Sequence, residues 1–210
     1  MKDTIAWEGG TLSAEWHEPA KGDTYLVLAH GAGGNMHAPS LRAFADALAA
    51  GGVGAVRFNL PYAEAGKGSP GPQARNEAGW RAVAAHVTGR AAKVFLGGRS
   101  YGGRLASHIV AAGTPASGLV FLAYPLHPPG KPERIRDAHL RDIRVPMLFL
   151  QGTRDPFATP SLLDATIASL ADATLHRVEG GDHSHKVRGR SPAEVNDELC
   201  AVTLDWIATR

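Results

Sequence analysis

Cysteine, long apolar runs and excess charge are all scarce in this 210-residue sequence, and each scarcity excludes a class of protein. The single cysteine, Cys200, cannot form an internal disulfide, so we expect a protein of the reducing cytoplasm. No apolar run approaches the roughly 18 residues of a membrane span, and residues 1–10 lack the apolar stretch of a secretory signal. A formal net charge of +2 is too small to predict a nucleic acid or an anionic membrane as partner.

Apolar runs alternate with longer amphipathic stretches along the chain, which is typical of strands alternating with helices. The apolar runs are nearly continuous, so we expect strands that are buried on both faces of a mostly parallel sheet. The expected strands are 24–30, 54–60, 93–98, 118–124, 145–152 and 173–180. The expected helices are 38–50, 73–90, 101–112, 160–171 and 192–208. The sequence therefore predicts an α/β fold, in which Cys200 is a buried residue of the last helix rather than a nucleophile.

The remaining segments complete the predicted architecture. Residues 4–19 contain two extended segments around a Gly-Gly pair, which predicts an antiparallel hairpin at the sheet edge. No repeat or composition break divides the chain, and its length suits one core, so we expect a single domain over 1–210. Segment 61–73 is rich in glycine and proline, and segment 125–144 is rich in proline and then charged. Both follow carboxyl ends of expected strands, where open α/β sheets bind ligands, so we expect them to line a pocket.

Residues 98–102, Gly-Arg-Ser-Tyr-Gly, match the pattern G-x-S-x-G. The bare pattern is weak in a glycine-rich chain, but here an apolar strand ends at it and a helix begins just after it. Such a tight turn strains the serine and lifts its hydroxyl out of the sheet, and the flanking glycines avoid collisions with the neighbouring strand and helix. The alternative is a helix N-cap serine after a glycine turn. The context favours Ser100 as a nucleophile.

A serine nucleophile needs a base that removes its proton, and the base needs a carboxylate that orients it. Asp155 comes just after the expected strand 145–152, and His183 comes just after the expected strand 173–180. Because the carboxyl ends of parallel strands meet at one edge of a sheet, both side chains should lie near Ser100. We therefore interpret Ser100, Asp155 and His183 as a catalytic triad.

Two nearby residues are alternatives for these roles. Asp182 could replace Asp155 as the acid, although side chains of adjacent residues rarely face each other well enough to pair with His183. His185 could replace His183 as the base, but it lies further into the loop. Asp182, His183 and His185 could also suggest a metal site, but no further cluster of ligands is evident, so we expect no metal.

The triad also needs an oxyanion hole, in which backbone N–H groups face the oxygen that becomes negative. One donor should be the N–H of Tyr101, the residue after the nucleophile. The other should come from the glycine-rich stretch HGAGGNMHAP (30–39), and its position indicates the N–H of Ala32. We expect His30 to brace this loop by hydrogen bonding, as a structural residue.

Residues of the loops could contact a substrate. The candidates are His37 at the pocket rim and three residues in or beside the two long loops: Tyr62, Tyr124 and His127. Each of the four could equally be an ordinary packing residue. Nothing in the sequence calls for a cofactor.

Four stretches together resemble the α/β-hydrolase superfamily over nearly the whole chain: HGAGG (30–34), GGRSYGG (97–103), QGTRDPF (151–157) and GDHS (181–184). The order Ser, Asp, His is the one found in that superfamily. Four longer strings are similar to the smaller group of KANSL/Tex30-type α/β-hydrolase-like domains: HGAGGNMHAP, RFNLPYAEAGK, YPLHPPGKPERIR and LFLQGTRDPF.

The resemblance implies an α/β-hydrolase fold near the dienelactone hydrolase branch, with no large cap domain. Dienelactone hydrolases carry a cysteine nucleophile, whereas this chain has Ser100. We expect a carboxylesterase-like serine hydrolase that cleaves a small ester, thioester or lactone, with a small-molecule acyl substrate as its partner. Because some relatives of this group serve as scaffolds, the alternative is a non-catalytic binding or scaffold protein.

Overall fold

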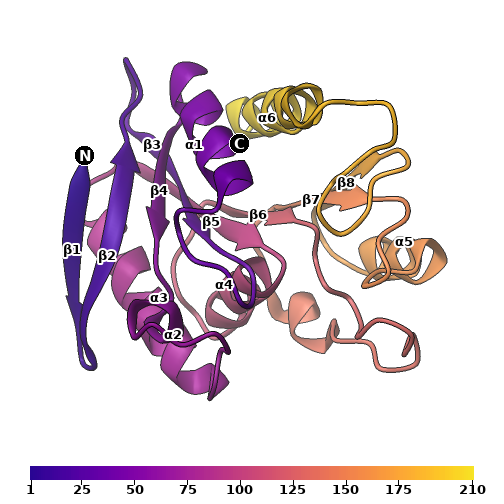
Figure 1. The fold of residues 1–210 in the computed structure, drawn as a ribbon, viewed down its shortest axis with the longest axis horizontal. Coiled ribbons are helices and arrows are strands. Elements are labelled where there is room, and N and C mark those ends of the chain that lie inside the picture. The colour runs from indigo at the N-terminus through magenta and orange to yellow at the C-terminus, as the bar shows by residue number, and fades with distance from the viewer.

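The centre of the fold is one eight-stranded sheet, in a computed structural model that describes residues 1–210 (Figure 1). The strand order across the sheet is β1-β2-β4-β3-β5-β6-β7-β8. The strands are β1 (Lys2–Trp7), β2 (Gly10–His17), β3 (Thr24–Ala29), β4 (Gly54–Phe58), β5 (Lys93–Arg99), β6 (Gly118–Leu122), β7 (Met147–Gly152) and β8 (Ala173–Val178). All neighbours from β4 to β8 run parallel, and the hairpin β1–β2 joins β4 antiparallel. The structure confirms the predicted mostly parallel sheet with its N-terminal hairpin.

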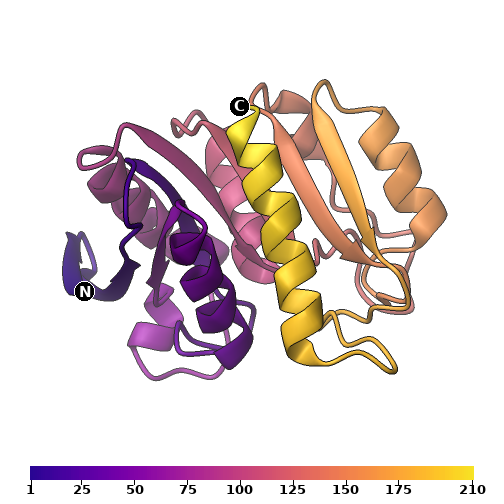
Figure 2. The same cartoon turned by 90° about the horizontal axis from the view of Figure 1, so that it is seen from above.

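Helices cover both faces of the sheet, so the central strands β3 to β7 are buried from two sides, whereas β1, β2 and β8 are partly exposed. The helices are α1 (Pro39–Ala50), α2 (Pro61–Glu64), α3 (Gln73–Thr88), α4 (Tyr101–Ala111), α5 (Pro160–Ala168) and α6 (Pro192–Ala208). Apolar residues of α1 and α6 pack together against one face, and α3, α4 and α5 pack against the other. Figure 2 shows α1 and the yellow α6 on the same side. None of the helices combines the length and the apolar character that a membrane crossing requires.

Local hydrogen bonds fix the start of helix α6. Helix α6 begins with a capping box, in which the Ser191 hydroxyl accepts from the Glu194 N–H and the Glu194 carboxylate accepts from the Ser191 N–H. A proline then occupies the first helical position, where its missing N–H costs nothing. Cys200 lies buried in this helix, and burial raises the pKa of its thiol to about 11.

Several predicted boundaries differ from the observed ones by one to three residues, and three of these differences have a clear local cause. The strand expected over 118–124 ends at Leu122, because Ala123 has a positive φ of 58° and the chain bends there. The strand expected from residue 145 begins at Met147, because Pro146 has no N–H to offer a neighbouring strand. The helix expected to residue 171 ends at Ala168, where the Ser169 hydroxyl donates to a carbonyl of the last turn.

The chain order of the strands places the loops that matter. From β3 the chain crosses to β4 on one side, and after α3 it returns to β5 on the other side of β3. The sheet therefore reverses its winding between β3 and β5, and ligands of open α/β sheets bind outside the carboxyl ends at such a point. The long connection between β6 and β7 contains only the 3₁₀ helix Ala138–Asp142, so no large cap domain covers this edge.

Candidate active site

Ser100 lies on a strained turn between β5 and α4. Its backbone has φ 49° and ψ −115°, a conformation that an L-residue with a side chain adopts only under constraint. The Ser100 N–H donates to Leu122 O over 2.9 Å, which fastens the turn to β6. A Cβ on Gly98 would stand 2.2 Å from the Ala29 oxygen, and one on Gly102 would stand 2.5 Å from the His30 oxygen. Side chains at these two positions would push the turn away from β3.

Three side chains from three different strand ends meet at this turn. His183 Nε2 lies 2.8 Å from Ser100 Oγ, and His183 Nδ1 lies 2.7 Å from Asp155 Oδ2. Because an ionised carboxylate only accepts hydrogen bonds, Nδ1 carries the proton and Nε2 is free to accept the hydroxyl of Ser100. The Asp155 side chain is fully buried, whereas the His183 side chain is 21% exposed. The structure thus brings the three predicted residues into one hydrogen-bonded chain.

The carboxylate of Asp155 is held on both oxygens. Oδ1 accepts the Phe157 N–H over 2.8 Å, and Oδ2 accepts the Gln151 amide over 2.6 Å in addition to facing His183. The Phe157 ring stacks on the His183 imidazole, with ring centres 4.1 Å apart and planes inclined by 28°. These contacts leave the imidazole little freedom to turn away from Ser100.

Asp182 does not take the place of Asp155 beside His183, and His185 does not take the place of His183 beside Ser100. Asp182 Oδ1 accepts the N–H groups of Ser184 and Lys186 at 2.7 and 2.9 Å, so this carboxylate closes the turn of the loop. His185 is buried, and its Nε2 donates to a carbonyl of β7 over 3.0 Å. Burial lowers the pKa of His185 to about 4, which keeps it neutral. In the structure, Asp155 and His183 are therefore the acid and base nearest to Ser100.

The loop after β3 stands beside Ser100, as the oxyanion prediction requires. A Cβ on Gly31 would lie 3.7 Å from the Cβ of Ser100. The Gly31 carbonyl accepts from His30 Nδ1 at 2.9 Å, from the Tyr62 hydroxyl at 2.9 Å and from the Gly34 N–H at 3.1 Å. In a trans peptide the C=O and the N–H point in opposite directions, so these bonds also fix the direction of the Ala32 N–H.

Two backbone N–H groups near Ser100 have no partner of their own. Ala32 N–H donates to no group in the protein. Tyr101 is the first residue of α4, and the first N–H groups of a helix have no intrahelical acceptor. His30 braces the loop as predicted, because its Nε2 accepts the Leu60 N–H over 3.1 Å while Nδ1 faces Gly31. Burial lowers the pKa of His30, consistent with a neutral ring that donates on one side and accepts on the other.

Arg99 joins the serine turn to the histidine loop. It is the last residue of β5, and its guanidinium donates to the His183 carbonyl over 2.7 Å. Burial lowers the pKa of Arg99, while the charges of Asp182 and Asp155 oppose that lowering. A hollow of about 140 Å³ lies between Arg99, the loop after β3 and the start of α1. A larger hollow of about 430 Å³ lies at the other end of the sheet, between the start of β3 and the end of α6, away from the triad.

The four expected substrate contacts stay predictions, and the structure shows where each side chain lies. Tyr62 is buried, and its hydroxyl is used by Gly31; burial raises its pKa to about 12. Tyr124 is buried, and its hydroxyl donates to Arg136 O over 3.1 Å. His127 is buried, and its ring links Pro128 O to Thr159 over 2.9 Å contacts. All three side chains are therefore buried, and their polar atoms have partners within the protein.

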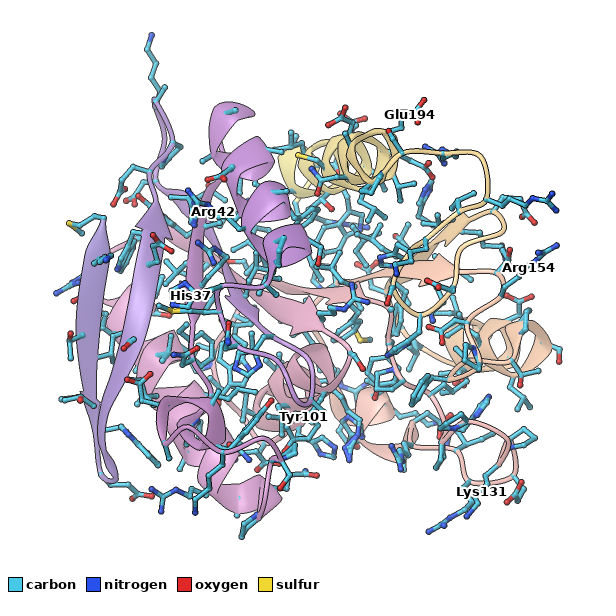
Figure 3. All side chains as sticks on the ribbon, viewed as in Figure 1. His37, Arg42, Tyr101, Lys131, Arg154 and Glu194 are labelled. Carbon is cyan, nitrogen blue, oxygen red and sulfur yellow. The ribbon has the colours of Figure 1, made fainter.

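The expected contact of His37 with a substrate also stays a prediction. His37 is an exposed residue of the loop between β3 and α1, and its N–H donates to Asn35 Oδ1 over 2.9 Å. Figure 3 shows His37 in the left half of the view and Tyr101 lower, near the centre.

Sequence reasoning missed the residues that support the triad. Gln151 and Phe157 flank Asp155 in the stretch that was quoted for the resemblance, and both contact the Asp155–His183 pair. Arg99 occupies the variable position of G-x-S-x-G, which the pattern does not constrain. An amide or an aromatic residue near an acid in sequence is no signal by itself, because only the folded chain shows which way it points.

The reversal point of the sheet, the strained serine turn and the chain Ser100–His183–Asp155 define the α/β-hydrolase class of fold. Solved structures with a similar fold include the following three. An alpha-beta serine hydrolase homologue from Coxiella burnetii is 18% identical with a TM-score of 0.78, and the match covers 96% of each chain. A serine hydrolase without lid from Xanthomonas campestris is 22% identical with a TM-score of 0.77, and the match covers 98% of this chain and 94% of that one.

The third is a dienelactone hydrolase from Anabaena variabilis, 16% identical with a TM-score of 0.79, matched over all of this chain and 96% of the other. At such identities the likeness establishes the fold. The family model of the alpha/beta hydrolase domain matches residues 22–208, and the chain belongs to this family. The narrower resemblance to KANSL/Tex30-type domains stays a prediction.

Proposed function

We propose that the protein is a carboxylesterase-like serine hydrolase, which cleaves a small ester, thioester or lactone through an acyl-enzyme on Ser100. The observation that supports this most directly is the continuous contact from Ser100 Oγ through both ring nitrogens of His183 to Asp155, at 2.8 and 2.7 Å. A buried carboxylate at the end of such a chain stabilises the imidazolium that forms during catalysis. Membership of the alpha/beta hydrolase domain family agrees with this chemistry.

In the first half of the reaction, His183 Nε2 takes the proton of the Ser100 hydroxyl while Oγ forms a bond to the carbonyl carbon of the substrate. The negative oxygen of the tetrahedral intermediate accepts from the N–H groups of Ala32 and Tyr101. The intermediate then collapses, and His183 passes its proton to the leaving oxygen or sulfur. This releases the alcohol or thiol, or opens the lactone, and leaves the acyl group on Ser100.

In the second half, a water molecule gives a proton to His183 as its oxygen bonds to the acyl carbon. The same two N–H groups hold the new oxyanion. When this intermediate collapses, Ser100 Oγ leaves and takes the proton back from His183, and the carboxylic acid departs. Asp155 stays ionised throughout, because its part is to fix the tautomer of His183 and to stabilise the positive ring.

Labelling with a fluorophosphonate tests the proposal directly, because this reagent phosphonylates only activated serine hydroxyls. We expect the wild-type protein to be labelled and Ser100→Ala to be unlabelled. Ser184→Ala is the matched control, because Ser184 is an exposed serine next to His183 whose hydroxyl takes no part in the triad. It should label like the wild type.

A wild-type protein that is folded but takes no label would reject the enzyme and favour the binding or scaffold alternative. If labelling succeeds, p-nitrophenyl esters of increasing chain length identify the acyl groups that the site accepts. Release of p-nitrophenolate should depend on Ser100 for every ester.

A further inference from the structure

Arg104 lies one helical turn beyond Ser100, on the same side of α4 as Tyr101. Residues three apart on a helix are neighbours, with about 5–6 Å between their Cβ atoms, and helical side chains lean toward the N-terminus. In α4 the N-terminus is the end that carries Ser100. The guanidinium reaches Gln73 Oε1 at 3.2 and 3.4 Å, and Gln73 is the first residue of α3, directly after the loop 65–72. Arg104 therefore leans toward the edge of the sheet where Ser100 lies.

The charge of Arg104 has no counterion in the protein. Its polar contacts are the amide oxygen of Gln73 and the ring of His108, at 3.4 Å, and both groups are neutral. Its Nε is buried and has no hydrogen-bond partner. The nearest acid of α3, Glu77, is already paired with Arg81 at 3.2 Å. A buried donor on an unpaired cation is costly to leave unsatisfied, so this group is a candidate for binding an anion.

Two further guanidinium groups come from the segment 125–144, on the other side of α4. The His108 ring stacks on the His139 ring, with centres 3.8 Å apart, and the Tyr124 hydroxyl connects His139, at 3.5 Å, to Arg136 O, at 3.1 Å. This series of contacts brings the backbone of Arg136 close to the Arg104 group.

Arg136 and its neighbour Arg134 are exposed, and like Arg104 they form no ion pair. Burial and the positive charges of Arg104 and Arg134 lower the pKa of Arg136, so the three charges repel one another. The acid that follows them, Asp137, faces Arg141 at 3.6 Å. Figure 3 shows Lys131 and Tyr101 in the lower half of the view.

We propose that Arg104, assisted by Arg134 and Arg136, binds an anionic group of the substrate, so that the ester cleaved at Ser100 carries a carboxylate or an equivalent negative charge. This rests on the proposed function of Ser100. A carboxylate can accept two parallel bonds from a guanidinium, and it would neutralise the unpaired charge of Arg104. It would also relieve the repulsion among the three arginines.

Pairs of similar esters, of which one member carries a carboxylate, test the proposal. On the acyl side, p-nitrophenyl hydrogen glutarate is compared with p-nitrophenyl valerate, which has the same chain length. On the alcohol side, 4-acetoxybenzoate is compared with phenyl acetate. The enzymes are the wild type, Arg104→Gln and the control Arg42→Gln, which removes the same charge from an exposed arginine of α1 on the other face of the sheet.

In at least one pair, we expect the wild type to have a kcat/KM about tenfold higher for the acidic ester, as one charge-assisted hydrogen bond predicts. Arg104→Gln should abolish that preference while changing the neutral ester little, and Arg42→Gln should keep it. Added sodium chloride should reduce the preference, because salt screens partly exposed charges. Equal rates within both pairs, or a preference that survives in Arg104→Gln, would overturn the proposal.

A binding measurement separates this proposal from the proposed function. Monomethyl glutarate, which carries both an ester and a carboxylate, is titrated into Ser100→Ala and into the double variant that also carries Arg104→Gln. We expect binding to the first that weakens about tenfold in the second. If fluorophosphonate labelling fails but this difference is found, the anion site stands without the enzyme. If labelling succeeds but the two variants bind equally, only the anion site is wrong.

Discussion

Replacing Tyr62 by phenylalanine tests whether the oxyanion loop is held in place by hydrogen bonds to one carbonyl. The Gly31 oxygen accepts three bonds, and the Tyr62 hydroxyl supplies one of them at 2.9 Å. Since the Gly31 carbonyl and the Ala32 N–H belong to the same planar peptide, loosening the first loosens the second. Tyr62→Phe keeps the buried ring and removes only the hydroxyl.

The expected loss of kcat in Tyr62→Phe depends on the hydrogen bonds that still hold the Gly31 carbonyl. A neutral hydrogen bond contributes about 1 kcal/mol net, which corresponds to about fivefold in an equilibrium or a rate. Removing an oxyanion donor altogether costs about 3–4 kcal/mol, or about 10²–10³ in kcat. Because His30 and the Gly34 N–H still hold the carbonyl in Tyr62→Phe, we expect the smaller effect. The kcat should fall about fivefold with KM nearly unchanged, because the bond acts on the transition state.

The assay is steady-state hydrolysis of p-nitrophenyl acetate, together with urea unfolding. Tyr25→Phe is the matched control, because Tyr25 is also buried, also has a pKa raised to about 12 and bonds through its hydroxyl to Glu18 near the start of β3. Tyr62→Phe should lose about 1 kcal/mol of unfolding free energy, and Tyr25→Phe about 1.5–3 kcal/mol because its partner is a carboxylate. Only Tyr62→Phe should lose kcat. An unchanged kcat in a destabilised Tyr62→Phe would refute the reasoning, and a loss beyond 10²-fold would mean that the hydroxyl touches the substrate.

Three further predictions concern the acid, the turn and pH. Asp155→Asn should lower kcat by about 10³–10⁴-fold, because an amide favours the wrong tautomer of the imidazole. Asp182→Asn should lower kcat less than about tenfold, because an amide oxygen can still accept the N–H groups that close the loop. If both variants lost the same kcat in ester hydrolysis, Asp155 would not be the acid of the triad. Gly102→Ala should lower the unfolding free energy by about 2–3 kcal/mol in urea, since its Cβ would meet the His30 and Ala29 oxygens; wild-type stability would contradict the strain. Burial lowers the folded pKa of His185 to about 4, so the unfolded chain binds more protons below pH 6.5 and stability should fall there by about 1.4 kcal/mol per unit; urea midpoints constant from pH 7.5 to 5 would exclude this.

Much of the fold could be predicted because each local pattern agreed with the whole. The continuous apolar runs became buried strands, and the two-residue Gly9-Gly10 signal became the end of the β1–β2 hairpin, with Ile5 opposite Leu12. Element ends were less accurate, because they depend on single residues such as Ala123, whose positive φ has no signal in sequence.

The strand–turn–helix context of Ser100 and the chain positions of Asp155 and His183 were enough to select three residues that the structure brings together. Their catalytic roles stay predictions until they are tested. Orientation is what the sequence could not supply. Tyr62 and His127 follow carboxyl ends of the sheet, as pocket residues do, yet both turn inward, where backbone groups of Gly31 and Thr159 meet their polar atoms.

Arg99 connects the end of strand β5 to the loop that carries His183. Arg99 is the last residue of β5, and Ser100 lies on the strained turn just beyond the strand. The Arg99 guanidinium donates to the carbonyl of His183, the residue that we propose as the base. A one-residue shift of β5 would therefore both misplace the Ser100 hydroxyl and break the bond of Arg99 to the loop that carries His183. Because Gly98 packs against Ala29 with no room for a Cβ, β3 opposes such a shift, and the geometry of the triad depends on the register between these two strands.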